Sequence, residues 1–402
     1  MNILFLSLLD FTTFDEKNIY SDLLREFIKH GHNVFCISPV ERRKKEKTHL
    51  LNIENSCILK LKIGNVQKTN VIEKGISTLL IEHLFIKGIK KYFSKNKFDL
   101  VLYATPPVTF EKVIRFVKKR DKAKSYLMLK DIFPQNAVDI GMMSTSGIKG
   151  VLYKFFRNKE KNLYKQSDTI GCMSRANVEY LLKHNAEIDK AKVEICYNSI
   201  EIQDNEITNE RKADLRNKYG VPLEKKVFVY GGNLGKPQGI PFIIDCLRAE
   251  SNNDKAFFLI VGDGTEFSVI EDFINRKKPQ NVKLLRRLPK EDYEQMICAC
   301  DVGLIFLDYR FTIPNFPSRL LSYMQAGLPV IASTDTNSDI GEVIVKGGFG
   351  WWCESNDVNQ FSTCIKEALN FRGDSKKEKD YLREHFSVEK CYETIVKSVG
   401  GI

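Results

Sequence analysis

Residues 227–240 read Val-Phe-Val-Tyr-Gly-Gly-Asn-Leu-Gly-Lys-Pro-Gln-Gly-Ile, and this stretch decides the fold. Its first four residues form a short apolar run rich in β-branched and aromatic side chains, which predicts a buried strand. Glycines follow at four of the next nine positions, and residues 240–247 have helical apolar spacing, with Pro241 suited to a first turn. A strand, a glycine loop and a helix in this order are typical of phosphate-binding α/β proteins, because backbone N–H groups and the helix N-terminus attract the oxygens.

The spacing of these glycines narrows the possible ligands. It matches neither GxGxxG nor GxxxxGK[ST], so the dinucleotide and P-loop fingerprints lose support. Lys236 would add a full positive charge to the loop if a phosphate bound there. Glycine-rich turns also join strands to helices without binding a ligand, so a plain connection remains an alternative.

The composition is typical of a globular protein with two or three domains, since the chain has 402 residues with 43% hydrophobic and 28% charged. The ten cysteines include no CxxC pair and no Cys/His cluster of zinc spacing. The apolar start, residues 1–9, is too short for a signal peptide or a membrane span. We therefore expect a cytoplasmic protein with reduced thiols.

Charge is distributed unevenly along the chain. Residues 1–200 hold 35 Lys and Arg against 21 Asp and Glu, whereas residues 201–402 hold 27 against 30. A basic half suggests contact with an anionic surface or a phosphorylated substrate, and a solvated lysine-rich surface is the alternative. The chain has no helix-turn-helix, RNA-binding or zinc-finger signature, so we expect no nucleic acid as a partner.

Apolar strands alternate with amphipathic helices in both halves of the chain. A strand at residues 2–8, a helix at 19–30 and a strand at 33–38 predict a parallel sheet with right-handed crossovers. The charge run at 41–47 is interpreted as a mobile loop. The polar, acidic segment 201–211 marks a domain boundary, after which the alternation starts again. This pattern predicts an α/β protein with two Rossmann-like, doubly wound domains.

Three predicted helices of the first half, at residues 75–93, 110–124 and 150–166, combine lysines with an apolar face. Such helices lie on anionic membranes when the apolar face is unoccupied. They are ordinary surface helices when that face packs on a sheet, and the sequence leaves both interpretations open.

The second half offers three strand-end loops that could converge on one ligand, at residues 231–239, 262–264 and 286–289. A fourth segment leads into a helix, and its Arg319 could bind a diphosphate through two parallel hydrogen bonds. A salt bridge at the helix start is the alternative for Arg319. In the first half, Asp131 follows a strand directly, at the sheet edge where α/β proteins keep their chemistry.

Several motifs together resemble one family. Val-Gly-Asp-Gly-Thr-Glu at 261–266, residues 285–307, Ala-Gly-Leu-Pro-Val-Ile-Ala at 326–332 and Asn198 are similar to the retaining family-4 glycosyltransferases of GT-B fold. The resemblance covers nearly the whole chain. Residues 231–239 and 314–332 look closest to the branch that builds bacterial capsule polysaccharide and O-antigen repeats, including fucosamine-type transferases.

The resemblance implies two Rossmann-like domains that face each other across a cleft. Residues 1–200 would bind the acceptor, and residues 201–385 would bind the nucleotide sugar. Residues 386–402 would form a last helix that crosses back to the first domain.

The resemblance also assigns residues to a site. Asp131 takes a catalytic position at which the family often has histidine. The donor-binding set comprises Gly232, Asn233, Gly235, Lys236, Gln238, Gly262, Arg286, Arg287, Leu288, Asn315, Phe316, Pro317, Ser318, Arg319 and Ser322. The acceptor-binding set comprises Asn18, Tyr20 and Thr105.

The sequence departs from the family at an acidic pair. The family carries two glutamates eight positions apart, and by spacing from Gly327 these positions are Pro314 and Ser322 here. Ser322 could still bond a ribose hydroxyl, whereas Pro314 cannot replace a carboxylate.

The family's phosphate-binding arginine and lysine are also missing, because their positions are Asn233 and Gln238. Lys236 and Arg319 could supply that charge and, with backbone N–H groups, stabilise the departing diphosphate. The chain has no Asp-x-Asp motif, so we expect no metal and no cofactor. The resemblance implies that the leaving phosphate helps to deprotonate the acceptor hydroxyl.

We therefore expect a hexosyltransferase-type glycosyltransferase that moves a sugar from a UDP-sugar to a polyprenyl-diphosphate-linked glycan in bacterial surface polysaccharide synthesis. The donor class, an N-acetylated aminosugar, rests on the resemblance alone. The enzyme would be a peripheral membrane protein on the anionic inner face of the plasma membrane. Two alternatives remain, a nucleotide-sugar 2-epimerase of the same fold and a non-catalytic subunit that binds nucleotide or lipid.

Overall fold

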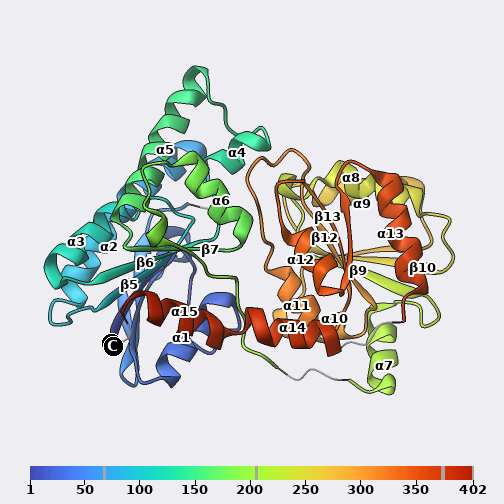
Figure 1. Cartoon of the computed structure of the whole chain (residues 1–402), viewed down its shortest axis with the longest axis horizontal. Coiled ribbons are helices and arrows are strands. Elements are labelled where there is room, and N and C mark those ends of the chain that lie inside the picture. Colours follow the sequence, from blue (N-terminus) through green and yellow to red (C-terminus); the bar gives the residue numbers. More distant parts are fainter. Residues whose placement is uncertain (67–68, 204–206, 373–375, 401–402) are drawn as a thin grey trace. The chain divides into compact units, whose positions relative to one another are not determined.

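The computed structural model describes residues 1–66, 69–203, 207–372 and 376–400. The chain forms two compact units, which Figure 1 shows with their elements labelled. Unit 1 comprises Met1–Glu201 and the segment from Val388 onward, and unit 2 comprises Ile202–Ser387. Four parts of the predicted domains, residues 67–68, 204–206, 373–375 and 401–402, lie outside the described residues. Within the described ranges, no helix combines the length and the hydropathy that a membrane span requires.

Unit 1 is built on an eight-stranded sheet of order β3-β4-β2-β1-β5-β6-β7-β8. All neighbouring strands are parallel except β3 and β4, which pair antiparallel at the edge. The strand order reverses between β1 and β5, which makes the carboxyl ends of these strands the expected ligand position. The strands are β1 (Asn2–Leu6), β2 (Asn33–Glu41), β3 (His49–Ile53), β4 (Ser56–Ile63), β5 (Leu100–Ala104), β6 (Lys124–Leu129), β7 (Thr169–Cys172) and β8 (Val193–Ile195).

Helices cover the unit 1 sheet because each parallel crossover passes over it. Helix α2 packs against α3 and α3 packs against α5, so these three helices share one face. Helix α15 packs against α1, where Tyr392 contacts Phe27 with ring centroids 5.0 Å apart. The helices are α1 (Ile19–Lys29), α2 (Val71–Tyr92), α3 (Glu111–Asp121), α4 (Gln135–Asp139), α5 (Gly147–Gln166), α6 (Arg175–His184) and α15 (Val388–Ser398).

The prediction of a mobile loop at residues 41–47 is wrong in its first part, because Arg42–Lys44 form a short 3-10 helix directly after β2. Lys44 forms an ion pair with Asp10. Asp10 also pairs with Lys60, which is buried in β4. The charge run is therefore held by partners that lie far away in the sequence.

Unit 2 is built on a parallel six-stranded sheet of order β11-β10-β9-β12-β13-β14. The central strand β9 includes Gly231, Gly232 and Asn233, which pair with β10 up to Asp263. The loop that was predicted to begin at Gly231 therefore begins three residues later, after Asn233. The strands are β9 (Lys226–Asn233), β10 (Ala256–Asp263), β11 (Val282–Leu285), β12 (Val302–Phe306), β13 (Val330–Thr334) and β14 (Gly350–Glu354).

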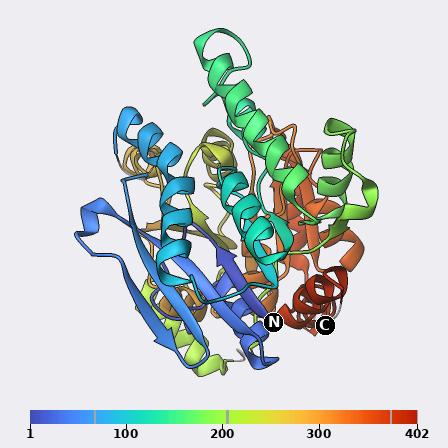
Figure 2. The ribbon, with the colours of Figure 1, turned by 90° about the vertical axis from the view of Figure 1, so that its left-hand side faces the viewer.

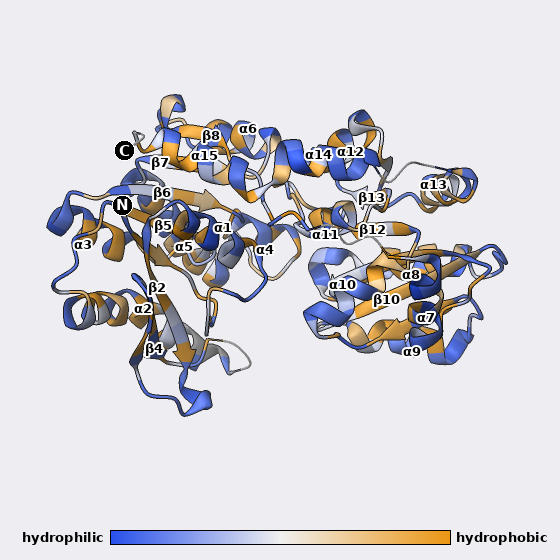
Figure 3. Ribbon diagram, turned by 90° about the horizontal axis from the view of Figure 1, so that it is seen from below, coloured by the Kyte–Doolittle hydropathy of each residue, from blue (hydrophilic) through white to orange (hydrophobic). Residues whose placement is uncertain are grey.

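Buried apolar side chains hold the layers of unit 2 together. Phe228, Phe258, Leu304 and Ile331 from four strands belong to one core cluster. Figure 3 shows hydrophobic colouring along the strands and mixed colouring on the helices, as expected for helices that cover a buried sheet. The helices are α7 (Asn209–Tyr219), α8 (Ile240–Ala249), α9 (Phe267–Lys277), α10 (Lys290–Cys298), α11 (Arg319–Gln325), α12 (Ile340–Gly347), α13 (Val358–Asn370) and α14 (Lys376–Phe386).

Two glycines of unit 1 are expected to respond oppositely to alanine. A Cβ on Gly171 in β7 would lie 2.4 Å from Tyr126 Oη and 2.6 Å from Cys196 Cβ. We expect Gly171→Ala to lower the free energy of unfolding by about 1–3 kcal/mol, because buried atoms must shift. Gly75→Ala in α2 meets no atom within 4 Å and should raise that free energy by about 0.5–1 kcal/mol. Urea unfolding followed by circular dichroism measures both, and equal effects would contradict the assignment.

Candidate functional site

Unit 2 contains a cavity of about 390 Å³ at the carboxyl ends of β9, β10 and β11. It is lined by Gly231, Gly232, Asn233, Val261, Gly262, Asp263, Arg287, Leu288, Lys290 and Tyr293. Residues from all three predicted strand-end loops therefore meet in one space. Lys290 and Tyr293 belong to the first turn of α10. The sequence analysis missed both residues, because they lie outside the three predicted strand-end loops.

Glycine forms one wall of the cavity because a side chain there would collide with neighbouring groups. A Cβ on Gly262 would lie 1.9 Å from the carbonyl oxygen of Gly232. A Cβ on Gly231 would lie 1.8 Å from Tyr293 Oη. Gly232 also has a φ of +142°, which side-chain-bearing residues rarely adopt. Backbone groups therefore face the cavity directly.

Arg319 lies behind this glycine wall. A Cβ on Gly232 would be 2.9 Å from Arg319 Nη2, and Arg319 Cζ lies 4.4 Å from the ring centroid of Tyr230. Arg319 Nη1 is buried and has no hydrogen-bond partner among the described residues. No ion pair to Arg319 is present within the same ranges, so the alternative of a helix-start salt bridge is not found there. A buried guanidinium that leaves Nη1 without a partner beside a glycine backbone is suited to an anionic ligand.

Tyr323 supports the glycine wall by hydrogen bonding to the backbone of β9. Tyr323 Oη accepts a hydrogen bond from Gly231 N at 3.1 Å and lies 3.1 Å from the carbonyl oxygen of Val229. The ring of Tyr323 fills the space that a Cβ on Gly303 would need. The wall is thus held by buried aromatic residues of α10 and α11 rather than by the loop itself.

The loop after β9 is stabilised by its own side chains. Gln238 Oε1 accepts hydrogen bonds from Asn233 Nδ2 at 2.9 Å and from Gly235 N at 3.3 Å. Tyr230 Oη donates to the carbonyl oxygen of Asn233 at 2.6 Å. Gln238 therefore stabilises the conformation of the loop. Gly235, Gln238 and the exposed Lys236 do not line the cavity.

Two neighbouring arginines after β11 have different environments. Arg286 pairs with Asp263 at 3.2 Å, and its Cζ lies 3.6 Å from the ring centroid of Phe267. Arg287 lines the cavity together with Leu288. The sequence could not show which of the two arginines lines the cavity, because both directly follow the same strand.

The segment before α11 packs within unit 2 and does not line the cavity. Phe316 is buried against Phe386, and Asn315 N donates to Ser338 Oγ at 2.9 Å. The predicted donor residues that are absent from the cavity lining are Gly235, Lys236, Gln238, Arg286, Asn315, Phe316, Pro317, Ser318, Arg319 and Ser322.

In unit 1, Thr105 and Asp131 meet at the carboxyl ends of β5 and β6. Thr105 Oγ1 donates to the carbonyl oxygen of Asp131 at 3.0 Å and accepts from Asp131 N at 3.2 Å. Asn136 Nδ2 lies 2.8 Å from both carboxylate oxygens of Asp131. Burial raises the pKa of Asp131 to about 6, although the Asn136 hydrogen bond opposes this shift.

Tyr20 lies near this carboxylate. Burial raises the pKa of Tyr20 to about 12, and the charge of Asp131 adds to the shift. The structure therefore places Tyr20 near Asp131, which Thr105 contacts; their roles in acceptor binding and catalysis stay predictions. A half-buried carboxyl with a raised pKa is a recurring feature of catalytic acids and bases.

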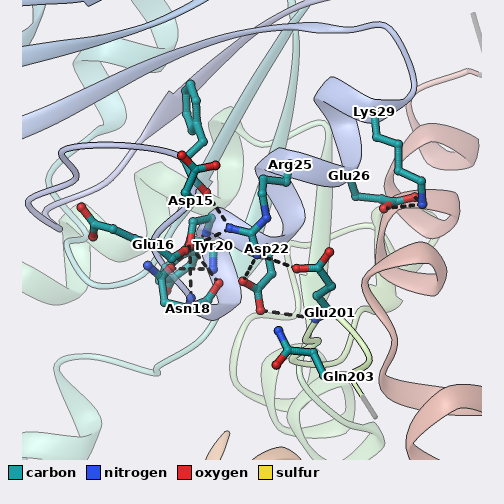
Figure 4. Close-up of polar contacts among 12 residues, drawn as sticks. Asp15, Glu16, Asn18, Tyr20, Asp22, Arg25, Glu26, Lys29, Glu201 and Gln203 are labelled. Atoms are coloured by element: carbon teal, nitrogen blue, oxygen red, sulfur yellow. Dashed lines mark hydrogen bonds and ion pairs between the residues drawn. The ribbon is translucent and has the colours of Figure 1, made fainter. Parts of the chain in front are cut away.

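Asn18 caps the helix that carries Tyr20, as Figure 4 shows. Its Oδ1 accepts hydrogen bonds from Tyr20 N and Ser21 N, each at 3.0 Å. Asparagine is a favoured N-cap because it satisfies N–H groups that the helix leaves free. Arg25 on the same helix pairs with Asp22 at 2.6 Å and with Glu201 at 2.8 Å.

In the described part of the chain, no three side chains of His, Cys, Asp or Glu are grouped so that they could hold a metal ion.

Comparison with known proteins finds one family model that matches much of unit 2. Residues 211–385 match the family described as "Glycosyl transferases group 1". The chain is 24% identical to the "Probable glycosyltransferase WbjE" of Pseudomonas aeruginosa over 318 residues, which are 79% of this chain and 76% of that protein. It is 25% identical over 246 residues to the "N-acetyl-alpha-D-glucosaminyl L-malate synthase" of Bacillus anthracis, with 58% and 61% covered.

Among solved structures, the crystal structure of HepE from Anabaena in complex with UDP has the same fold. The TM-score is 0.70 with 16% sequence identity, and the match covers 100% of both chains. The predicted α/β architecture with two Rossmann-like domains of GT-B type is thereby confirmed.

Asp131 is expected to titrate with a pKa of about 6 instead of its ordinary 3.8. Because the folded-state pKa is raised, the neutral carboxyl stabilises the fold fully below pH 3.8, and this stabilisation is lost as the pH rises through about 6. Asn136→Ala removes a bond to the charged form and should raise the pKa further. Carbon-13 NMR titration measures the midpoint, with Asp131→Asn identifying the signal. A midpoint that Asn136→Ala leaves unchanged would contradict this account.

Proposed function

We propose that this chain, which has the GT-B fold and whose residues 211–385 match the glycosyl transferases group 1 family, is a glycosyltransferase with the following donor, acceptor and mechanism. It transfers a sugar from a UDP-sugar to a polyprenyl-diphosphate-linked glycan, with retention of configuration and without a metal. The reaction is a step in the synthesis of a bacterial surface polysaccharide of the capsule or O-antigen kind. The observation that carries the proposal is the glycine-walled cavity with Arg319 behind it.

The cavity is suited to the diphosphate of a nucleotide sugar. Its backbone wall at Gly231 and Gly232 permits close approach of phosphate oxygens, and Arg287 and Lys290 stand at its lining. A cavity of about 390 Å³ lies in the size range of small-molecule sites. The HepE complex supports UDP as the nucleotide, since a protein of this fold holds it.

The donor sugar is an N-acetylated aminosugar. The malate synthase of Bacillus anthracis supports this choice, because its name describes the transfer of an N-acetylglucosaminyl group. The capsule and O-antigen context rests on the resemblance of residues 231–239 and 314–332 to that branch of transferases.

The leaving diphosphate is stabilised by positive groups instead of a metal ion. Arg319 neutralises the charge that develops as the sugar bond breaks, and the glycine N–H groups add hydrogen bonds. The same phosphate accepts the proton of the attacking hydroxyl, so transfer proceeds on one face with retention. Pro314 stands where relatives of this type carry a carboxylate, which makes the cationic groups more important here.

Unit 1 binds the acceptor at the cluster of Tyr20, Thr105 and Asp131. A carboxyl with a pKa of about 6 is charged at neutral pH, so Asp131 orients the acceptor hydroxyl for attack, while the proton passes to the leaving phosphate. The lipid tail of the acceptor stays in the membrane, which places the enzyme at the cytoplasmic face of the plasma membrane.

Calorimetric titration with UDP, GDP, ADP and dTDP tests the donor directly. We expect UDP to bind most tightly and EDTA to leave its affinity unchanged. Preference for another nucleotide would overturn the donor, and loss of binding in EDTA would overturn the metal-free mechanism. The anomeric configuration of the product, read by proton NMR, tests retention.

Two cations near the glycine segment are expected to contribute unequally to UDP binding. Arg319→Met should weaken binding by about 10- to 100-fold, because a hydrogen-bonded charge is lost. Lys236→Met should change the affinity little, since the charge of Lys236 is exposed to solvent, whereas Arg319 lies against Gly232 with a buried, unpartnered Nη1. Arg319→Lys should recover part of the affinity. Equal losses in the two Met variants, with folding verified by circular dichroism, would remove Arg319 from the diphosphate site.

A further inference from the structure

The N-terminal half of α5 carries an apolar stripe that the described residues of unit 1 leave uncovered. Ile148, Val151, Leu152 and Phe155 have exposed fractions from 38% for Phe155 to 92% for Ile148. Their spacing places all four on one face of the helix. The C-terminal half of the same helix is ordinary, because Leu163 and Tyr164 are buried.

Helix α2 is divided in the same way. Ile76, Leu79 and Leu80 in its first half are exposed, whereas Phe85 and Ile89 in its second half are buried.

Helix α3, the second of the three basic helices predicted from the sequence, differs from the other two. Its apolar residues Val113, Ile114 and Val117 are fully buried. The alternative of an ordinary packed helix therefore holds for α3, and only α2 and α5 leave apolar surface unoccupied.

The two exposed halves lie on the same side of unit 1. Lys159 Nζ of α5 pairs with Glu82 Oε2 of α2 at 2.9 Å. Both helices precede a strand of the parallel sheet, so they run in the same direction. At about 1.5 Å per residue, Ile76 lies about 9 Å and Ile148 about 16 Å beyond this ion pair, toward the N-terminal ends. Figure 2 shows the N-terminal end of α5 projecting at the top of the view.

This side is also the edge that carries the acceptor cluster. In a parallel α/β unit, the N-terminal ends of the helices stand at the carboxyl ends of the strands. Asp131 and Thr105 lie at that edge, and the chain passes from Asp131 through α4 and the exposed Met142 into α5. The apolar stripe therefore stands beside the predicted acceptor position.

The charges around the stripe favour an anionic partner. Residues 147–159 contain two exposed lysines, Lys149 and Lys154, and no acidic residue. At 3.6 residues per turn these lysines fall on opposite sides of the stripe. Lysine is depleted in the cores of protein–protein interfaces, whereas lysines that flank an apolar face are typical of helices in the interface of an anionic bilayer.

We propose that unit 1 docks on an anionic lipid bilayer through the first half of α5, with the exposed turns of α2 as a second contact. The apolar stripe enters the boundary between headgroups and acyl chains, and Lys149 and Lys154 meet lipid phosphates. The proposal takes from the proposed function the reason for docking, a lipid-linked acceptor, but it stands on its own observations.

Vesicle flotation of the full chain tests the surface. We expect binding to phosphatidylcholine vesicles that contain phosphatidylglycerol, weaker binding to pure phosphatidylcholine, and release by added salt. Replacing Val151 and Leu152 by Glu should reduce binding about tenfold or more. The matched control replaces Leu223 and Val345, exposed apolar residues of unit 2, by Glu and should bind as the wild type does.

The possible outcomes separate docking from catalysis. Unchanged flotation of the Val151→Glu/Leu152→Glu variant, or no flotation of the wild type, would overturn the docking surface. A dimer in sedimentation that only this variant loses would assign the stripe to a second copy of the chain instead. If UDP fails to bind while flotation still depends on the stripe, the proposed function fails and the docking surface stands. Transfer to a water-soluble acceptor should be equal in wild type and variant, whereas transfer to a polyprenyl acceptor in vesicles should fall in the variant.

Discussion

The close approach of β9 and β10 at their carboxyl ends is the constraint on which unit 2 depends. The strands stay paired as far as Asn233 and Asp263, so the carbonyl oxygen of Gly232 occupies the space that a side chain on Gly262 would need. The same lack of side chains lets Arg319 reach Gly232. Backbone therefore forms one wall of the cavity, and helices α10 and α11 bring the cations and aromatic rings to it.

Unit 1 uses a different arrangement at the equivalent position of its sheet. A half-buried carboxylate, Asp131, is held by Asn136 only five residues later, on the short helix α4. The chain then continues into α5, whose first half is exposed and whose second half packs in the unit. One continuous segment thus connects the proposed acceptor cluster with the surface proposed to meet lipid. An acceptor with a sugar end and a lipid end would be held at both ends by this segment.

Much of the fold was predictable because it depends on neighbours along the chain. Apolar periodicity predicted most strands of both sheets, and the glycines after residue 230 marked the wall of the cavity. The strands β3, β4 and β14 were not predicted. In β4 the buried Lys60 interrupts the apolar pattern, and its partner Asp10 lies fifty residues away. Of the expected donor residues, five line the cavity, whereas Lys290 and Tyr293 come from a helix that the strand-end rule does not reach.

The sequence by itself determined the two parallel sheets, the glycine wall and the basic character of the first half, since composition and short-range periodicity are sufficient for these features. Only the tertiary structure decided which of Arg286 and Arg287 faces the cavity, and that Asn18 caps a helix. It also decided which basic helices keep an uncovered apolar face. These properties depend on contacts between residues far apart in the chain. The sequence pattern of one segment does not show which other segments pack against it.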